Sequence, residues 1–360
     1  MAYPTAHHGR SKPDMDCISR NHVVRVASYE ELAKQYLCWR ISPEGSFEDL
    51  LEFPRFFEIE TINACNAHCP MCTIESWTRH SPIMSMDLFT KIADEIGEYT
   101  DQVHRVSLFK DCEPLLDKKL SQRIALLKEC GVKNVAIHTN VSLLDEKRGK
   151  AILEAGLDEI TLSIDSLDKE VFEEIRKGLS LEVVLENAIK FIELRNRIRP
   201  QSQIKVRMIK QDSNRDEWEA YEAFWQGKLA PHDRCFTRNI HNWGGQLEGH
   251  KHVAESLQPQ VPCLSLWSAM VIFADGDVPM CTVDFNNTYP TGSVLKNIIK
   301  ELWDSPVMVE RRQTHMEHRR GVFPSCRTCN VWDEPSDFEK LFDDYVKQMA
   351  YLEGLDIKTG

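Results

Sequence analysis

The chain has 360 residues, of which 42% are apolar, enough for one large core of barrel size and an appended module. Its formal net charge is −12, which makes nucleic acid an unfavourable partner. No apolar stretch approaches the roughly 18 residues that a membrane span needs. Residues 1–16 are polar and lack the apolar centre of a signal peptide. We therefore expect a cytoplasmic protein that acts on neither membranes nor nucleic acid.

From residue 55 onward, strand patterns alternate with helix patterns. Runs of β-branched and aromatic residues predict strands at 56–61, 103–109, 133–138, 158–163, 203–209 and 235–240. Amphipathic spacing predicts helices at 86–99, 118–130, 145–155, 169–177, 181–196 and 216–225. A helix at 29–40 and a loop at 42–46 precede them. Such units form a parallel sheet, so we expect an α/β fold: a partial (β/α)6 barrel that resembles an open TIM barrel.

After residue 245 the alternation of strand and helix patterns ends. Strands at 269–273 and 278–281 flank a turn at 274–277 and are expected to form a β-hairpin. Helices follow at 298–303 and 306–312. These elements predict a second, smaller α+β module. We divide the chain into an N-terminal extension (1–50), the barrel (51–245), the second module (246–335) and a C-terminal helix (336–360).

Seven of the twelve cysteines fall into two patterned groups. In a reducing compartment, such spacing indicates metal binding or catalysis rather than disulfides. The first group is Cys65, Cys69 and Cys72, with CxxxCxxC spacing directly after the first predicted strand. Thiolates hold iron–sulfur clusters, and four close a cubane, so three leave one iron open. A structural zinc site needs a fourth ligand, which His68 could hardly supply from inside the same tight loop.

The second group has four members, Cys263, Cys281, Cys326 and Cys329. Four cysteines can ligate a complete second cluster, but a tetrathiolate zinc site uses the same number. Gly276 lies in the predicted turn just before Cys281. The spacing alone leaves both metals open.

The first cysteine motif, placed after the first strand of a (β/α)6 barrel, resembles the signature of the radical SAM superfamily. This resemblance implies a [4Fe–4S] cluster on Cys65, Cys69 and Cys72. It also implies that the open iron chelates S-adenosyl-L-methionine (SAM), whose reductive cleavage yields a 5′-deoxyadenosyl radical that abstracts a substrate hydrogen atom. The protein's own tasks are then to bind, to orient and to exclude water.

The resemblance further implies a SAM site built from the ends of several strands. The segment 111–114 (DCEP) resembles the GGEP motif, in which Glu113 would bind the SAM amino group while Asp111 stands at a glycine position. The segment 139–140 resembles the start of a TNG motif, and 163–166 resembles SxDG. The implied cofactor-binding residues are Met71, Asp111, Glu113, Asn140, Ser163, Asp165 and Arg207. Ser163 and Asp165 could instead cap a helix, and Arg207 could form a surface salt bridge.

The second cysteine group resembles the Twitch and SPASM auxiliary-cluster domains. No cysteine follows Cys329, so the resemblance implies one further [4Fe–4S] cluster on Cys263, Cys281, Cys326 and Cys329. Over residues 55–335 the chain is similar to the aminocyclitol dehydrogenases of aminoglycoside antibiotic biosynthesis. That similarity implies oxidation of a carbinol in a sugar, polyol or aminocyclitol to a ketone, with an electron passing to the auxiliary cluster. It also implies a flavodoxin- or ferredoxin-type reductant.

Several alternatives remain open at the level of sequence. An epimerase or dehydratase could use Cys235 as a catalytic hydrogen donor if its thiol faces the barrel mouth; otherwise Cys235 is a small buried hydrophobe. A dehydrogenase needs a base, for which Arg207, Lys210, His138 and His241 are candidates. A peptide-maturing enzyme is a third possibility, although residues 1–50 are short for a leader-binding domain. A zinc-containing scaffold that only binds a ligand is the fourth.

Overall fold

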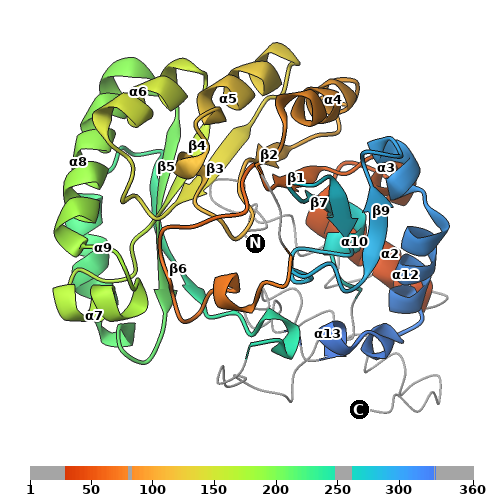
Figure 1. Ribbon diagram of the computed structural model, residues 1–360. Helices are drawn as coiled ribbons and strands as arrows, with labels where there is room; N and C mark the ends of the chain where they lie inside the picture. Colours follow the sequence, from red (N-terminus) through yellow and green to blue (C-terminus); the bar gives the residue numbers. More distant parts are fainter. Residues whose placement is uncertain (1–28, 80–82, 248–261, 328, 330–360) are drawn as a thin grey trace, which may run out of the picture.

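The computed structural model describes residues 29–79, 83–247, 262–327 and 329 (Figure 1). Its main feature is a seven-stranded sheet in the order β6-β5-β4-β3-β2-β1-β7, in which all neighbours run parallel. The strands are β1 (Phe56–Ile59), β2 (Arg105–Ser107), β3 (Val135–Thr139), β4 (Glu159–Ser163), β5 (Gln203–Lys210), β6 (Arg234–Asn239) and β7 (Ala269–Ile272). The predicted α/β class and the six predicted barrel strands are confirmed.

The helices between these strands cover the outer face of the sheet (Figure 1). They are α4 (Met86–Gly97), α5 (Leu120–Glu129), α6 (Glu146–Glu154), α7 (Lys169–Ile175), α8 (Leu181–Ile198) and α9 (Trp218–Gln226). Ser85 caps α4 by accepting a hydrogen bond from the Leu88 amide. Gly131 and Gly156 follow α5 and α6 with φ of +87° and +98°, a conformation that glycine adopts without strain.

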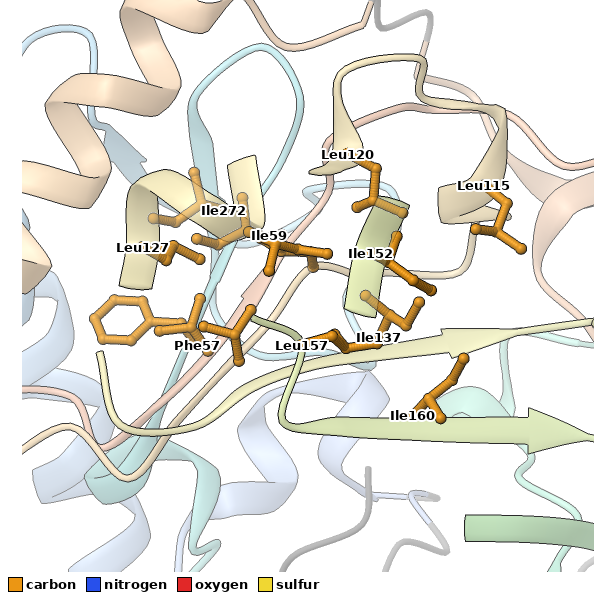
Figure 2. Packing of buried hydrophobic residues seen from close by; sticks show 14 of the residues in the cluster. Phe57, Ile59, Leu115, Leu120, Leu127, Ile137, Ile152, Leu157, Ile160 and Ile272 are labelled. Atoms are coloured by element: carbon orange, nitrogen blue, oxygen red, sulfur yellow. The ribbon is translucent and has the colours of Figure 1, made fainter. Parts of the chain in front are cut away.

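Strand residues alternate between two environments. Ile137 of β3 and Ile160 of β4 are fully buried and belong to one cluster with Leu127 of α5 and Ile152 of α6 (Figure 2). Because successive side chains point to opposite faces of a strand, their neighbours lie on the concave inner face. That inner face carries polar residues, among them Glu58, Ser107, His138, Ser163 and Arg207. We call the edge at the carboxyl ends of the strands the barrel mouth.

The predicted hairpin of 269–273 with 278–281 is formed only at its turn, where the Phe273 amide donates to the Asp277 carbonyl and the Gly276 amide donates to the Phe273 carbonyl, both at 2.9 Å. β7 pairs with β1 in parallel, from Phe56↔Ala269 to Ile59↔Ile272. β8 (Asp277–Pro279) instead pairs in antiparallel fashion with β9 (Pro290–Ser293), a strand that its proline and glycine conceal in the sequence. The apolar run of β7 suits a buried parallel strand, and it extends the sheet beyond β1. The chain still turns at Gly276, whose φ is +87°.

The remaining elements surround the β7 side of the sheet (Figure 1). They are α2 (Tyr29–Ile41), α3 (Phe47–Glu52), α10 (Ser265–Ser268), α11 (Ile299–Trp303), α12 (Pro306–Met316) and α13 (Pro324–Arg327). The sequence reading missed α3, which begins with a capping box between Ser46 and Asp49. Residues 1–28 of the predicted extension and the helix predicted at 336–360 lie outside the described residues. In the described ranges, no helix is long and apolar enough to cross a membrane.

Candidate active site

The first cysteine group occupies the loop between β1 and the short 3-10 helix η1 (Ile74–Ser76). The Cys72 amide donates to the Cys69 carbonyl at 2.9 Å, and the His68 amide donates to the Lys177 carbonyl at 2.9 Å. Burial raises the pKa of the Cys65 and Cys72 thiols, and a metal bound by them would favour the thiolate form. The exposed His68 ring bonds to Glu75 instead of completing a fourth ligand position.

This donor set fits an iron–sulfur cluster with one open iron. Three thiols lie on one tight loop at the barrel mouth. Across the described ranges, no three His, Cys, Asp or Glu side chains converge closely enough to hold a single metal ion. Because Glu75 engages His68, the loop offers three thiols, which suit a cubane with one open iron better than a four-coordinate structural zinc.

Glu113 is the centre of a buried network beside this loop. Its carboxylate accepts hydrogen bonds from the Asn140 amide at 2.7 Å, the Thr139 hydroxyl at 2.8 Å and the Leu115 amide at 3.0 Å. Asn140 in turn donates to the Cys65 sulfur at 3.8 Å. Burial raises the pKa of Glu113 to about 7, against these hydrogen bonds, which lower it. The network therefore brings the predicted Glu113 and Asn140 to the first cysteine loop.

Two residues at glycine positions of the resembled motifs have left-handed backbone conformations. Asp111 has φ of +51° and Val141 has φ of +71°. Each costs on the order of 1–2 kcal/mol relative to glycine there. The Asp111 carboxylate forms an ion pair with the buried Lys110, so its side chain is already engaged. The motif shape is thus kept without its glycines.

Ser163, Asp165 and Arg207 meet on the inner face. Arg207 donates from Nη2 to the Ser163 hydroxyl at 2.8 Å, and its buried Nε has no hydrogen-bond partner among the described residues. Asp165 pairs with Arg176 at 2.6 Å, and Arg176 donates to the Cys69 sulfur at 3.8 Å. Asp165 therefore positions the Arg176 guanidinium beside the first cysteine loop and does not cap a helix. Burial, together with the nearby Arg176, lowers the pKa of Arg207 to about 10.

The second cysteine group gathers from separate segments of the chain. Cys281 follows β8, Cys326 lies in α13, and Cys263 precedes α10. Burial, with the thiols of Cys326, Cys263 and Cys329 close by, holds the pKa of Cys281 well above its usual value. Four neighbouring, half-buried thiols are the donor set that a complete cluster needs.

Comparison with known proteins agrees with both sites. Residues 59–218 match the radical SAM superfamily, and residues 263–330 match SPASM, an iron–sulfur cluster-binding domain. This chain is a radical SAM enzyme with a SPASM domain. These two domains imply [4Fe–4S] clusters and SAM as cofactors, which confirms the predicted cofactors.

Solved structures share the fold at low sequence identity. The chain is similar to BtrN in complex with AdoMet and 2-DOIA, with a TM-score of 0.54, 19% identity, and coverage of 77% of this chain and 93% of that one. It is also similar to Streptococcus suis SuiB bound to precursor peptide SuiA, with a TM-score of 0.58, 15% identity, and coverage of 72% and 67%. Native anSMEcpe with bound AdoMet gives a TM-score of 0.57 at 15% identity, covering 83% and 98%.

Among curated proteins, the chain is similar to probable GTP 3′,8-cyclases. It is 32% identical to that of Methanococcus maripaludis over 141 residues, which is 39% of this chain and 46% of the relative. The corresponding protein of Sulfolobus acidocaldarius is 32% identical over 128 residues, 36% of this chain and 40% of the relative. The matches thus span less than half of these relatives, and they carry no activity over to this enzyme.

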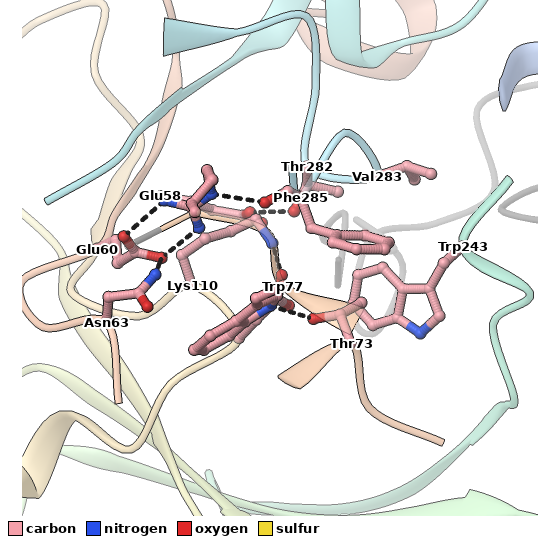
Figure 3. Close-up of polar contacts among 12 residues, drawn as sticks. Glu58, Glu60, Asn63, Thr73, Trp77, Lys110, Trp243, Thr282, Val283 and Phe285 are labelled. Carbon is pink, nitrogen blue, oxygen red and sulfur yellow. Dashed lines mark hydrogen bonds and ion pairs between the residues drawn. The ribbon is translucent and has the colours of Figure 1, made fainter. Parts of the chain in front are cut away.

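A polar network joins the radical SAM domain to the SPASM domain (Figure 3). Arg79, which follows the first cysteine loop, makes two hydrogen bonds to Glu60, at 2.8 and 3.1 Å. Its Nε donates to the Phe285 carbonyl at 2.7 Å, four residues beyond Cys281. Thr282, directly after Cys281, donates to the Glu58 carboxylate. The sequence reading missed these residues and Arg176, because their partners lie far away in the chain.

The structure also corrects the expectation that Cys235 could face the mouth. In the parallel ladder, Cys235 is paired with Val206, so both side chains point to the same face. Val206 is fully buried in the core cluster on the outer face. Burial, with the Glu222 carboxylate of α9 nearby, raises the pKa of the Cys235 thiol to about 12. Its thiol therefore lies on the side of α9, away from the inner face.

Proposed function

We propose that this radical SAM enzyme oxidises a carbinol carbon of a sugar, polyol or aminocyclitol to a ketone. When bound, SAM and the two clusters supply a radical that abstracts the carbinol hydrogen and an acceptor for the remaining electron. The substrate must then lose its hydroxyl proton to the protein. The residue that takes this proton must lie at the barrel mouth.

One observation carries the proposal: Glu58 links the inner face to the second cysteine group. Glu58 lies on the inner face of β1, in register with Ser107 of β2. Its Oε2 accepts the hydroxyl hydrogen bond of Thr282, which is bonded to Cys281 through the chain. A proton acceptor therefore lies beside the segment that holds the electron acceptor. This arrangement suits an oxidation, in which a proton and an electron leave the same carbinol carbon.

Three of the four other candidate bases, Arg207, His138 and His241, are less suited. Arg207, with a pKa of about 10, stays protonated at neutral pH and cannot accept the proton. Burial and then the cationic Arg207 hold the pKa of His138 well below its usual value, and burial lowers that of His241 to about 3. Both imidazoles are neutral, but their surroundings oppose the charged form that proton transfer would create. Arg207 fits better as a positioning group for a carboxylate of SAM or substrate.

The first test uses the anaerobically reconstituted enzyme and a panel of deuterated polyols, beginning with 2-DOIA, the compound bound to BtrN. We expect deuterium in 5′-deoxyadenosine and a ketone product. Glu58→Gln should still form deuterated 5′-deoxyadenosine while ketone formation falls by about 10²-fold or more. Glu75→Gln, an exposed carboxylate in η1 just after the first cysteine loop, is the matched control and should behave like the parent.

Products at the substrate's own oxidation level would overturn the proposal in favour of epimerisation or dehydration. Equal ketone formation by Glu58→Gln and the parent enzyme would remove Glu58 from the mechanism while leaving the oxidation itself standing. Turnover of a precursor peptide by the unaltered enzyme, with no polyol accepted, would instead support peptide maturation.

A further inference from the structure

A short loop lies between the two cysteine groups. It consists of Asn242, the 3-10 helix η4 (Trp243–Gly245) and Gln246. On the radical SAM side, the Trp243 indole donates from Nε1 to the Met71 carbonyl at 3.1 Å. Met71 is buried and stands directly before Cys72, so this hydrogen bond fixes a peptide group inside the first cysteine motif.

On the SPASM side, the same loop contacts the segments of two cysteine ligands. The Trp243 ring meets the Phe285 ring edge-on, with centroids 6.3 Å apart (Figure 3). Gln246 donates from Nε2 to the Trp243 carbonyl at 2.6 Å and to the Val283 carbonyl at 3.0 Å. Val283 and Phe285 both closely follow Cys281.

Gly244 completes the bridge. Its φ is +68°, and a Cβ placed there would lie 2.5 Å from the Ser325 carbonyl oxygen, next to Cys326. Only glycine permits this approach of two backbones. The buried Lys110 ammonium lies 5.5 Å from the centroid of the Trp243 ring and holds it by a cation–π contact. One ring thus touches the first cysteine motif, the end of β2 and the SPASM domain.

We propose that Trp243 is a positioning residue that couples the SPASM cluster site to SAM binding at the radical SAM cluster. A complete SPASM site fixes the segment 281–285, this segment holds the Trp243 ring, and the indole N–H holds the peptide before Cys72. Loss of the SPASM site releases that restraint. The SAM site then has to be ordered at the moment of binding, which weakens affinity. The coupling concerns SAM binding and does not depend on which substrate is oxidised.

The test is a double-mutant cycle on SAM affinity, with the anaerobically reconstituted protein and SAM alone as the probe. Cys281→Ala and Trp243→Phe should each weaken SAM binding by about fivefold or more, the lower range of measured couplings. Their combination should be little weaker than either single variant, because both break the same link. Trp243→Phe keeps an aromatic ring against Phe285 and removes the indole donor.

Trp77→Phe is the matched control. Its indole donates to the Thr73 hydroxyl at 2.9 Å, an indole hydrogen bond just after the first cysteine motif that remains within the radical SAM domain. Any effect of Trp77→Phe should simply multiply with that of Cys281→Ala. Iron content and circular dichroism verify that each variant is folded and carries its remaining cluster. If Trp243→Phe does not fold, Gln246→Ala takes its place in the cycle, because it removes the amide hydrogen bonds to the Trp243 and Val283 carbonyls.

Independent, multiplicative effects of Cys281→Ala and Trp243→Phe would overturn the proposal, as would unchanged SAM affinity in Cys281→Ala. Because the readout is binding, a failure of the oxidation test for Glu58 leaves this result intact, and the reverse also holds.

Discussion

Removal of the Arg79 guanidinium tests whether the polar network holds the two domains together. The Arg79 side chain is 8% exposed and that of Glu60 is fully buried. Arg79→Met leaves the Glu60 carboxylate with hydrogen bonds from the Asn63 amide group and the Ala274 amide, both at 3.1 Å. It also removes the donor to the Phe285 carbonyl and the stacking of the guanidinium 3.5 Å from the centroid of the Phe273 ring.

Breaking one side of a buried ion pair costs about 3–5 kcal/mol. Because Glu60 keeps two donors, we expect the lower end, about 3 kcal/mol. With an unfolding entropy of about 2.1 cal/mol/K per residue, a chain of this length shifts by about 1.3 °C per kcal/mol, so the unfolding midpoint should fall by roughly 4 °C. Scanning calorimetry of the anaerobic holoenzyme at one scan rate measures this shift.

The control for this prediction is Lys133→Met, which removes an exposed partner of Asp101 and should leave the midpoint unchanged. Adding Glu60→Gln to Arg79→Met should recover part of the loss, since it removes the uncompensated charge. A midpoint of Arg79→Met within about 1 °C of the parent would refute the reasoning.

Three further predictions concern the two cluster sites. Burial raises the pKa of Glu113 from 4.5 to about 7, so between these pH values the SAM-free folded state keeps a proton that the unfolded state loses. The free energy of unfolding should therefore fall as the pH rises from about 4.5 to about 7. Glu113→Gln should flatten this pH dependence in urea titrations. Cys235→Ala should leave SAM cleavage and product formation within about twofold of the parent, because the thiol lies on the side of α9; a large loss would place it in the mechanism. Cys281→Ala should lower iron from about eight to about four per chain while 5′-deoxyadenosine still forms; retention of eight irons would exclude Cys281 as a ligand.

Local patterns sufficed for the barrel. Strand runs, helix periodicity and the glycines after α5 and α6 repeat within about 30 residues, and the described strands and helices follow them closely. The pairing of β7 could not be predicted in the same way. Its sequence indicates the turn that follows it, whereas its parallel partner is the open edge of β1, more than 200 residues earlier. The position of β7 in the sheet thus depends on pairing with a distant strand and not on local strand propensity.

The cysteine groups were predicted because ligand spacing is local, whereas the residues around them were not. Arg176 reaches Cys69 from 107 positions away, and Trp243 reaches Met71 from 172 positions away. Each is an ordinary arginine or tryptophan in its own segment. For Cys235, the local pattern pointed the other way. Its place on a barrel strand suggested a catalytic thiol, but its pairing with Val206 places the side chain on the outer face of the sheet. A shift of one residue in a strand changes which face a side chain takes.

The pairing of β7 with β1 explains why the two cluster sites share one mouth. β7 ends at Ile272, beside the end of β1 at Ile59, so the chain leaves β7 at the same edge of the sheet as the first cysteine loop. The Ala274 amide then reaches Glu60, and Thr282 reaches Glu58. A second module that packed apart from the sheet would leave the edge of β1 open and give neither carboxylate a partner in the SPASM domain. The strand that the sequence assigned to a separate module is therefore the one that brings the second cysteine group to the radical SAM site.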